Sequence, residues 1–373
     1  GLLALHINTT IGALLFMVSD SNHYTGSRLT PIMESRYTLV EENGVRCTIC
    51  PHQCVIAEGK RGICYTKENQ DGKIIDLSYG RISALAVDPI EKKPLAHFYP
   101  GSLALSISSI GCNFTCPWCQ NYGLSMSKTD DVHTRYMEPE SVVEVALAQE
   151  CTSIAYTYNE PLINLNYIED TAEFAHESDV KNVLVTNGYT SIPAFSNVVD
   201  YIDAANVDWK GWNPEFYRKH CNADMYKVID ATEYMHDNGV HVEVTFLVIP
   251  TVNDDPEEIR GMAEYIRLNL GPDIPLHISR FFPMYKFQHL SPTPVETLMK
   301  AKKIAYEEGL RYVFVGNVRG GGEEDTVCPN CGERVIRRRG YTIIEWSLTQ
   351  EMKCSKCGEP IPIMGQRENH GSF

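Results

Sequence analysis

Short apolar runs alternate with longer stretches of helical periodicity over most of the chain. The apolar runs, which predict strands, are Leu103–Ser108, Ser153–Tyr158, Asn182–Thr186, Val207–Lys210, His241–Val248, Pro275–Phe281 and Tyr312–Val315. The helical stretches between them include Pro139–Glu150, Pro161–Ala175, Pro256–Leu268 and Val295–Glu308. Alternating strands and helices predict βα units and a parallel sheet. Six or seven such units favour a complete or partial barrel over a doubly wound sheet, with the chemistry at the carboxyl ends of the strands.

The pattern divides the chain into four parts. Residues 1–35 form an extension whose apolar stretch, Leu2–Val18, is interrupted by polar residues, lacks a basic flank and is too short for a membrane span. Residues 36–100 form a small irregular module, and residues 101–318 form the predicted barrel. Residues 319–373 begin with a glycine-rich acidic linker and continue into a second Cys-rich segment.

Composition narrows the class of protein. The 373 residues are 43% hydrophobic and 22% charged, as in a globular protein. The net charge is −15, which disfavours binding to nucleic acid or to an anionic membrane. The 13 cysteines are clustered, which indicates metal binding under reducing conditions rather than disulfide bonds. We therefore expect a cytoplasmic protein.

Three cysteines follow the first predicted strand of the barrel, where such folds keep their active sites. They are Cys112, Cys116 and Cys119, within the segment Gly111–Asn121. Three thiolates on one loop can bind three irons of a [4Fe–4S] cluster and leave the fourth iron without a protein ligand. An open iron, like an open zinc site, is a position where substrate or cofactor binds. A zinc knuckle is the alternative interpretation.

The CxxxCxxC spacing, with the aromatic Trp118 before its last cysteine, resembles the radical S-adenosylmethionine (SAM) superfamily. The resemblance implies that SAM chelates the open iron and that Trp118 lies at the cofactor. It also implies that one electron cleaves SAM to a 5′-deoxyadenosyl radical, which abstracts a hydrogen atom from the substrate. A reductase or a ferredoxin-like protein is implied as the electron donor.

Polar residues at the ends of the next two strands resemble SAM-binding motifs of the pyruvate formate-lyase activating enzymes. Glu160 stands where those enzymes have a Gly-Gly-Glu-Pro-like turn that receives the SAM amino group. Thr186 and Asn187 stand in an Asp-Thr-Asn-Gly-like turn near the SAM ribose or carboxylate. The alternatives are a charge at a helix start for Glu160 and an ordinary βα turn for Asn187.

Two later strands carry further candidates. Asp208 and Lys210 match the Asp-x-Lys motif of the same enzymes and, being two residues apart on a strand, share one face. We assign Asp208 to SAM binding and Lys210 to catalysis. His277 and Arg280, in the sixth strand, are expected to meet SAM or substrate, His277 as a cofactor-binding residue and Arg280 as a catalytic one. A core histidine is the alternative for His277.

A narrower resemblance extends over about residues 45 to 365. The segments Cys47–Cys54, Gly59–Cys64 and Asp88–Leu95, the later Gly316–Val318 and the terminal cysteines resemble the AmmeMemoRadiSam-system radical SAM enzymes. The fold implied is a partial (β/α)6-type radical SAM barrel with a small Cys-rich N-terminal module and a C-terminal zinc ribbon. AMMECR1-like and MEMO-like proteins are implied as partners by analogy.

Two further cysteine groups flank the barrel. Cys328, Cys331, Cys354 and Cys357 form two CxxC pairs, which predict a structural zinc ribbon. Cys47, Cys50, Cys54 and Cys64 have a less regular spacing, which fits structural zinc and an auxiliary iron–sulfur cluster equally well.

Three functions remain open at this point. The leading one is an enzyme that makes a radical on a residue of a partner protein, as a glycyl-radical activase does. The second is radical modification of a small molecule or cofactor precursor. The third, of another class, is a zinc-ribbon module with a vestigial barrel that binds protein or nucleic acid through the basic run Arg334–Arg339. The net charge of −15 and the intact cysteine triad argue against the third.

Overall fold

The computed structural model describes residues 31–318, 320 and 322–367. The apolar stretch Leu2–Val18, and with it most of the predicted extension of residues 1–35, lies outside this part of the chain. Within the described part, no helix has both the length and the apolar character that crossing a membrane requires.

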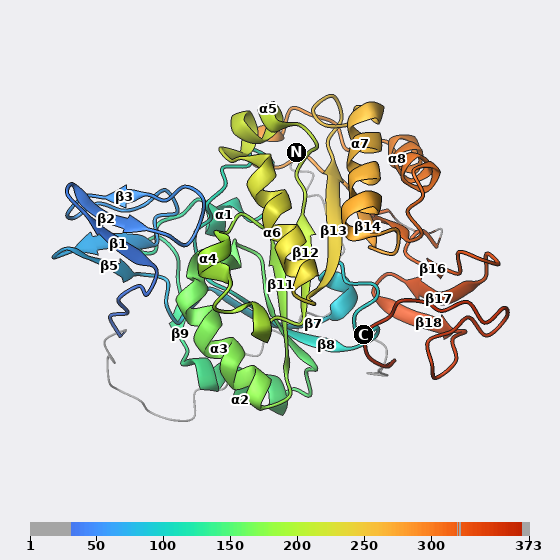
Figure 1. The fold of residues 1–373 in the computed structure, drawn as a ribbon, viewed down its shortest axis with the longest axis horizontal. Helices are drawn as coiled ribbons and strands as arrows, with labels where there is room; N and C mark the ends of the chain where they lie inside the picture. The colour runs from blue at the N-terminus through green and yellow to red at the C-terminus, as the bar shows by residue number, and fades with distance from the viewer. Residues whose placement is uncertain (1–30, 319, 321, 368–373) are drawn as a thin grey trace, which may run out of the picture.

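The centre of the molecule is an eight-stranded, mostly parallel sheet in the order β15-β14-β13-β12-β11-β10-β8-β7 (Figure 1). Its parallel strands are β8 (Leu103–Ser108), β10 (Ser153–Tyr156), β11 (Lys181–Thr186), β12 (Ala204–Asp208), β13 (His241–Val248), β14 (Leu276–Arg280) and β15 (Val313–Gly316). Each overlaps one of the seven predicted apolar runs, although β12 begins three residues before its run and shares only Val207 and Asp208 with it. The predicted α/β class with a largely parallel sheet is thus confirmed.

One strand of this sheet precedes the predicted barrel. Strand β7 (Ala84–Pro89) pairs antiparallel with β8, from Ala84 opposite Ser108 to Pro89 opposite Leu103. The sequence pattern grouped these residues with the Cys-rich module, because their apolar run is short and ends in Asp88 and Pro89. The central sheet therefore begins before residue 101.

Helices cover one face of the sheet. Figure 1 shows α3, α6, α7 and α8 side by side in chain order over the strands. The helices longer than five residues are α2 (Pro139–Ala148), α3 (Leu165–Glu177), α6 (Met225–Asp237), α7 (Pro256–Tyr265) and α8 (Val295–Glu307). The shorter ones are α1 (Tyr122–Ser125), α4 (Ile192–Phe195), α5 (Pro214–Phe216), η1 (Ile90–Lys92), η2 (Pro161–Asn164), η3 (Val199–Tyr201), η4 (Tyr217–Cys221), η5 (Ile266–Leu270) and η6 (Tyr285–Phe287). Asp224 and Asp255 accept hydrogen bonds from backbone N–H groups at the starts of α6 and α7, which stabilises both helix starts.

The segment 90–99, directly after β7, fills the other face of the sheet. Ile90, Leu95 and Phe98 are fully buried against Ala104, Ala155, Val183 and Ala204, whose small or medium side chains leave room for them. The Glu243 carboxylate of β13 accepts hydrogen bonds from the backbone N–H groups of Ala96 (2.9 Å) and His97 (2.8 Å). These hydrogen bonds hold the segment in place, and with it Lys92 and Lys93, which lie beside the strand ends.

Small modules flank the sheet on opposite sides (Figure 1). The N-terminal one contains β1 (Thr38–Glu41), β2 (Gly44–Cys47), β3 (Val55–Ile56), β4 (Lys67–Gln70) and β5 (Lys73–Asp76), followed by β6 (Arg81–Ile82), which pairs with β9 (Arg135–Tyr136). The C-terminal one contains β16 (Thr326–Val327), β17 (Arg334–Arg339) and β18 (Thr342–Trp346).

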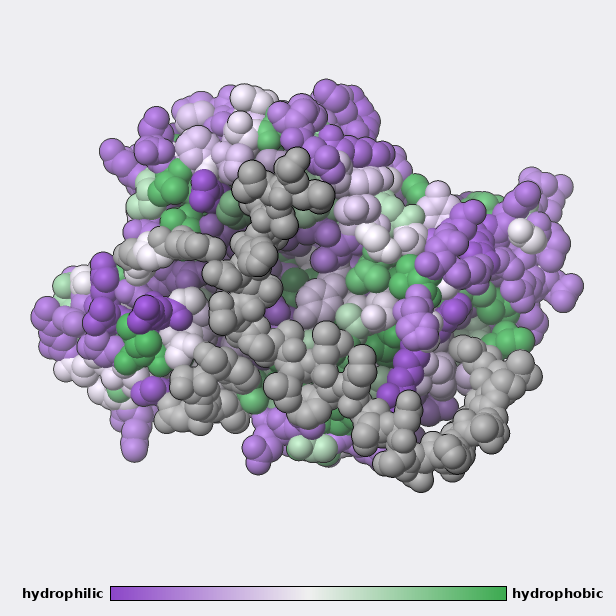
Figure 2. All heavy atoms as spheres, turned by 180° about the vertical axis from the view of Figure 1, so that it is seen from behind, coloured by the Kyte–Doolittle hydropathy of each residue, from purple (hydrophilic) through white to green (hydrophobic). Residues whose placement is uncertain are grey.

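The basic run in β17 is engaged within the molecule. Arg338 is buried and donates to the backbone oxygen of Ala96 (2.7 Å), and Arg337 pairs with Glu345 (2.7 Å). Arg334 lies 3.4 Å from the Asp325 carboxylate. These contacts leave the run poorly suited to bind phosphate. The face shown in Figure 2 is mainly hydrophilic where its atoms are coloured, with hydrophobic residues in small separate areas.

Candidate active site and metal sites

The three central cysteines lie together at the carboxyl end of β8. Cys112, Cys116 and Cys119 all line a cavity of about 330 Å³, whose other walls come from the ends of β10, β11, β12, β13 and β14. Among the described residues that line this cavity, they are the only thiols. The loop thus offers three sulfur ligands to one centre and leaves the side facing the cavity open, which fits a [4Fe–4S] cluster with one free iron.

A fourth sulfur lies close to the loop but behind it. Cys221 Sγ is 3.9 Å from Cys116 Sγ, and the backbone oxygen of Cys221 accepts a hydrogen bond from the N–H of Thr115 (3.2 Å). Cys221 is completely buried and does not line the cavity. Its position is that of a packing residue that supports the loop.

Glu160 lines the cavity as a buried carboxylate. It accepts hydrogen bonds from the Thr186 hydroxyl (2.6 Å) and from the backbone N–H groups of Asn187 (2.8 Å) and Leu162 (2.9 Å). Burial raises the pKa of Glu160 to about 7, although these hydrogen bonds favour the ionised form. Glu160 also begins the short helix η2, which is the alternative that the sequence offered for this residue.

Thr186 and Asn187 lie beside Glu160 at the end of β11, and both line the same cavity. Asn187 Nδ2 donates to Asn113 Oδ1 (2.9 Å) and lies 3.8 Å from Cys112 Sγ. Asn187 therefore connects the strand end to the cysteine loop, which is more than a βα turn alone requires.

Asp208 and Lys210 form an ion pair at the end of β12, with Lys210 Nζ 2.8 Å from Asp208 Oδ2, and both line the cavity. Burial alone would lower the pKa of Lys210, but the Asp208 carboxylate raises it above its usual range. Trp118 is buried at the cavity wall, where its ring packs against Phe216 (centroids 5.5 Å apart) and Phe287 (5.6 Å).

The structure does not bring the two candidates of β14 into this cavity. His277 Nε2 bonds the Glu243 carboxylate (2.5 Å), and its ring stacks on Phe314, but the same side chain lines a neighbouring cavity that is described below. Arg280 Nε donates to the backbone oxygen of Thr293 (2.8 Å), away from the cavity. Side chains three residues apart on a strand point to opposite faces. Ser279, which shares the face of His277, does line the cavity.

Sequence reasoning missed Lys93 and Tyr158. Both line the cavity, with Lys93 Nζ 4.9 Å from the centre of the Tyr158 ring. The Asp88 carboxylate accepts hydrogen bonds from Lys93 Nζ (2.7 Å) and the Tyr158 hydroxyl (2.8 Å). Burial lowers the pKa of Lys93 to about 8. Lys93 belongs to the motif Asp88–Leu95, and this motif could have drawn attention to it. The hydrophobic pattern of the motif, however, does not predict that this segment packs against the central sheet.

A second cavity of about 270 Å³ adjoins the first and shares Lys92, Pro94, Gln120, Ser279 and Asn317 with it. The C-terminal module contributes Arg338 and Tyr341 to its walls, and segment 90–99 contributes Glu91. Glu91 Oε2 and Arg338 Nε are buried without hydrogen-bond partners, which suits a polar ligand.

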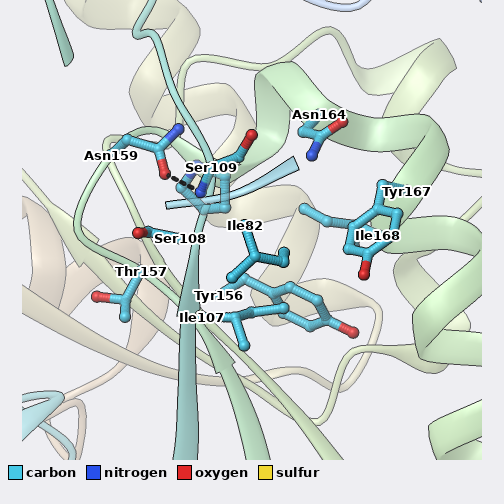
Figure 3. A pocket seen from close by; sticks show the side chains of 11 residues that line it. Ile82, Ile107, Ser108, Ser109, Tyr156, Thr157, Asn159, Asn164, Tyr167 and Ile168 are labelled. Carbon is cyan, nitrogen blue, oxygen red and sulfur yellow. Dashed lines mark hydrogen bonds between the residues drawn. The ribbon is translucent and has the colours of Figure 1, made fainter. Parts of the chain in front are cut away.

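A third cavity is much smaller. Figure 3 shows Ile82, Ile107, Tyr156 and Ile168 around it, with the Ser109 N–H donating to Asn159 Oδ1 (3.0 Å) at its edge. Its volume of about 20 Å³ has room for about one water molecule and is too small for a cofactor.

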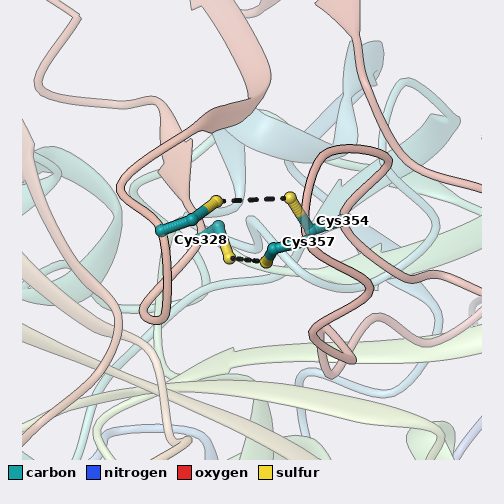
Figure 4. A group of neighbouring side chains, drawn as sticks. Cys328, Cys354 and Cys357 are labelled. Atoms are coloured by element: carbon teal, nitrogen blue, oxygen red, sulfur yellow. Dashed lines mark hydrogen bonds between the residues drawn. The ribbon is translucent and has the colours of Figure 1, made fainter.

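The four C-terminal cysteines form a compact group. Figure 4 shows Cys328 facing Cys357, with their sulfurs 3.5 Å apart, and the sulfurs of Cys331 and Cys354 are 3.7 Å apart. All four sulfurs lie within 4.8 Å of one another. The sequence prediction of a Cys-rich metal site here is thus consistent with the structure. The N-terminal Cys47, Cys50, Cys54 and Cys64 line a separate small cavity.

The chain is similar to several known proteins. The family model described as "Radical SAM superfamily" matches residues 106–265. The uncharacterized protein MJ0808 of Methanocaldococcus jannaschii is 43% identical over 329 residues, which cover 88% of this chain and 98% of that protein. The pyruvate formate-lyase 1-activating enzyme of Escherichia coli K12 is 20% identical over 55% of this chain and 89% of its own. A radical SAM methyltransferase structure from Sphaerobacter thermophilus covers 78% of this chain and 79% of its own, at 17% identity and a TM-score of 0.48.

Proposed function

The chain belongs to the radical SAM superfamily, and on that premise we propose that it acts as a glycyl-radical-activase-like enzyme on a residue of a partner protein. The observation that carries the proposal is the loop of three thiols that opens onto a cavity lined by Glu160, Asn187 and Asp208. The similarity to pyruvate formate-lyase activating enzymes supports the choice of a protein substrate.

In this proposal Cys112, Cys116 and Cys119 hold the [4Fe–4S] cluster. Glu160 receives the SAM amino group, because an ionised carboxylate that is already fixed by three hydrogen bonds is a preorganised partner for an ammonium. The cluster, when bound, supplies the electron that cleaves SAM to the radical that abstracts hydrogen from substrate.

The remaining cavity residues orient the cofactor and exclude water. Asn187 fixes the loop relative to β11, and the Asp208–Lys210 pair presents one negative and one positive group to the cavity. Trp118 closes one wall with an apolar ring. Lys93, held by Asp88, adds a buried cation that can donate a hydrogen bond to a carboxylate or ribose oxygen.

The substrate approaches, in this proposal, through the second cavity, because it adjoins the first and is walled on one side by the C-terminal module. The same cavity also favours the second candidate function, modification of a small molecule. Glu91 and Arg338 lie 3.8 Å apart as an ion pair, and a small polar ligand, like a peptide, would supply the hydrogen bonds that Glu91 Oε2 and Arg338 Nε lack.

Four further assignments belong to the proposal. The C-terminal thiols bind zinc, since sulfurs at 2.3 Å from one zinc ion stand about 3.8 Å apart, close to the spacing found here. A reductase or ferredoxin-like protein supplies the electron. AMMECR1-like and MEMO-like proteins are the first partners to test, and the reducing cytoplasm is the expected location.

The experiment uses the full chain, reconstituted and reduced without oxygen, and measures 5′-deoxyadenosine formed from SAM. We expect wild type and the Cys151→Ala control to form it, Cys116→Ala to form none, and the correct partner protein to accelerate it. Failure of the iron-loaded wild type to cleave SAM would contradict the enzyme assignment. Acceleration by a small-molecule fraction but by no protein would favour the second candidate.

A further inference from the structure

Two carboxylates, Glu91 and Glu324, line the second cavity, together with one buried cation, Arg338. In the proposed function the substrate approaches through this cavity, and the inference that follows rests on that function. We propose that the second cavity recognises a cationic group of the substrate, an alkylammonium or a guanidinium, through Glu91 and Glu324. A basic side chain of a partner protein presents this chemistry, and so does a small organic cation.

Glu91 is a buried carboxylate with an unused acceptor atom. Its side chain is 5% exposed, and its Oε1 accepts a hydrogen bond from the backbone N–H of Gly101 (2.9 Å). The same Oε1 lies 3.8 Å from Arg338 Nε, which is too long for a hydrogen bond. Among the described residues, Oε2 has no hydrogen-bond partner. A buried carboxylate oxygen without a partner is costly, and a ligand ammonium or guanidinium would supply one.

Glu324 lies two residues before β16 in the C-terminal module. Its backbone oxygen accepts a hydrogen bond from Arg338 (2.9 Å), but its carboxylate has no hydrogen bond or ion pair within residues 31–318, 320 and 322–367. Burial raises the pKa of both Glu91 and Glu324, although Arg338 favours their ionised forms. The one buried cation thus does not offset the charge of both carboxylates, and a bound cation would.

The cations that line the cavity already have oxygen partners. The Nη atoms of Arg338 donate to the backbone oxygens of Glu324 (2.9 Å) and Ala96 (2.7 Å). Lys92 Nζ is 2.7 Å from Asp88 Oδ1. Arg338 Nε lacks a partner within the described chain, and a neutral carbonyl oxygen of the ligand suits it. An anionic ligand would be repelled by the two carboxylates, so the cavity favours a cation.

The rest of the cavity suits a basic side chain. Its volume is about 270 Å³, and Leu95 and Phe314 offer apolar surface for methylene groups. Ser279 and Asn317 line both this cavity and the one at the cysteine loop. A cation bound here therefore lies next to the proposed SAM site, where it can fix the position of a substrate.

The test measures, by isothermal titration, the binding of small probes to the iron-loaded full chain with SAM and without reductant. N-acetyl-arginine amide and N-acetyl-lysine amide carry a cation, and the matching glutamine and glutamate amides are the neutral and anionic comparisons. We expect the cationic probes to bind at least about tenfold more tightly, as one hydrogen bond between charged groups provides. Agmatine carries the guanidinium without peptide groups. Weaker binding of agmatine than of the arginine amide would assign the cation to a protein side chain, and tighter binding would assign it to a small molecule.

The variants Glu91→Gln and Glu324→Gln each remove one negative charge at nearly constant size. Each should weaken the binding of the cationic probes about tenfold and change that of the neutral probe little. Glu324 is only partly buried, so its variant gives the reading if Glu91→Gln fails to fold. Glu323→Gln is the matched control, because the Glu323 carboxylate pairs with Lys302 (2.6 Å) and does not line the cavity. It should keep the wild-type affinities.

Equal affinity of the wild type for the cationic, neutral and anionic probes would overturn the proposal. Unchanged affinity of both glutamine variants for the cationic probes would overturn it as well. Cleavage of SAM by the wild type without any probe tests the enzyme assignment separately. Failure of the cation preference, with SAM cleavage intact, would leave that assignment standing.

Discussion

Glu160 is the residue on which SAM affinity should depend most strongly. Its carboxylate is neutral below its pKa of about 7 and ionised above it, and only the ionised form attracts the SAM ammonium. We expect the affinity for SAM to fall about tenfold as the pH decreases from about 8 to about 6. Isothermal titration of the iron-loaded protein measures this.

The variant Glu160→Gln removes the titrating group from the same position. Its affinity for SAM should be lower than that of wild type at the higher pH and nearly constant over the range. A wild-type affinity that does not change with pH, or a variant with the same pH dependence as wild type, would place the SAM amino group elsewhere.

Cys221 gives a residue-scale test of the cysteine loop. Because its sulfur lies behind Cys116 and outside the cavity, Cys221→Ala should keep about four irons in the central site. We expect a stability loss of about 1 kcal/mol from the small space created. Iron analysis of this variant in a background without the N-terminal cysteines measures the effect. Loss of central iron would identify Cys221 as a ligand.

Single residues also mark the limit of prediction from sequence. The triad, Glu160, Asn187 and Asp208 were identifiable because each lies at or just after the end of a strand and so reaches the same edge of the sheet. The position of Arg280 was not predicted: strand alternation puts its side chain opposite to that of His277, and it does not line the cavity. Lys93 does not lie at the end of a strand. It reaches the cavity only because segment 90–99 packs against the sheet in the folded protein.

Among the elements, segment 90–99 has the largest expected effect on stability. Phe98 is fully buried on the inner face of the sheet against alanines of three strands. We expect Phe98→Ala to lower the free energy of unfolding by about 3 to 5 kcal/mol. Leu147→Ala, at a side chain 52% exposed in α2, is the control and should change it by less than about 0.5 kcal/mol.

Urea denaturation of both variants measures this difference through the midpoint and slope of the transition. Equal midpoints would show that segment 90–99 does not fill the sheet in solution. The parallel strands were predictable because burial on both faces leaves continuous apolar runs. The position of segment 90–99 was not, because it depends on small side chains such as Ala104, Ala155 and Ala204 that lie far from it in the sequence.

At the scale of the whole molecule, the C-terminal module carries the four clustered thiols and also forms part of the wall of the second cavity. Its apolar residues pack on Tyr312, Phe314 and Ala96, and its Arg338 bonds the backbone of segment 90–99. We expect Cys354→Ser to lose about one zinc per chain, to lower the thermal midpoint, and to retain the irons of the central site.

Metal analysis and thermal unfolding of Cys354→Ser measure these effects, with Ser355→Ala, an exposed neighbour, as the control. Iron lost together with the zinc, in folded protein, would show that the metal sites are not independent. Unchanged zinc would show that the four thiols do not share one ion.

The most direct test concerns the iron that the three cysteines leave free. Electron–nuclear double resonance on the reduced full chain, with SAM labelled at its amino nitrogen or carboxylate oxygen, reports contact between SAM and cluster iron. The Cys50→Ala/Cys64→Ala variant allows the central cluster to be observed alone. We predict a hyperfine coupling from both labels. A fully loaded central cluster that shows coupling to neither label would contradict an iron open to SAM.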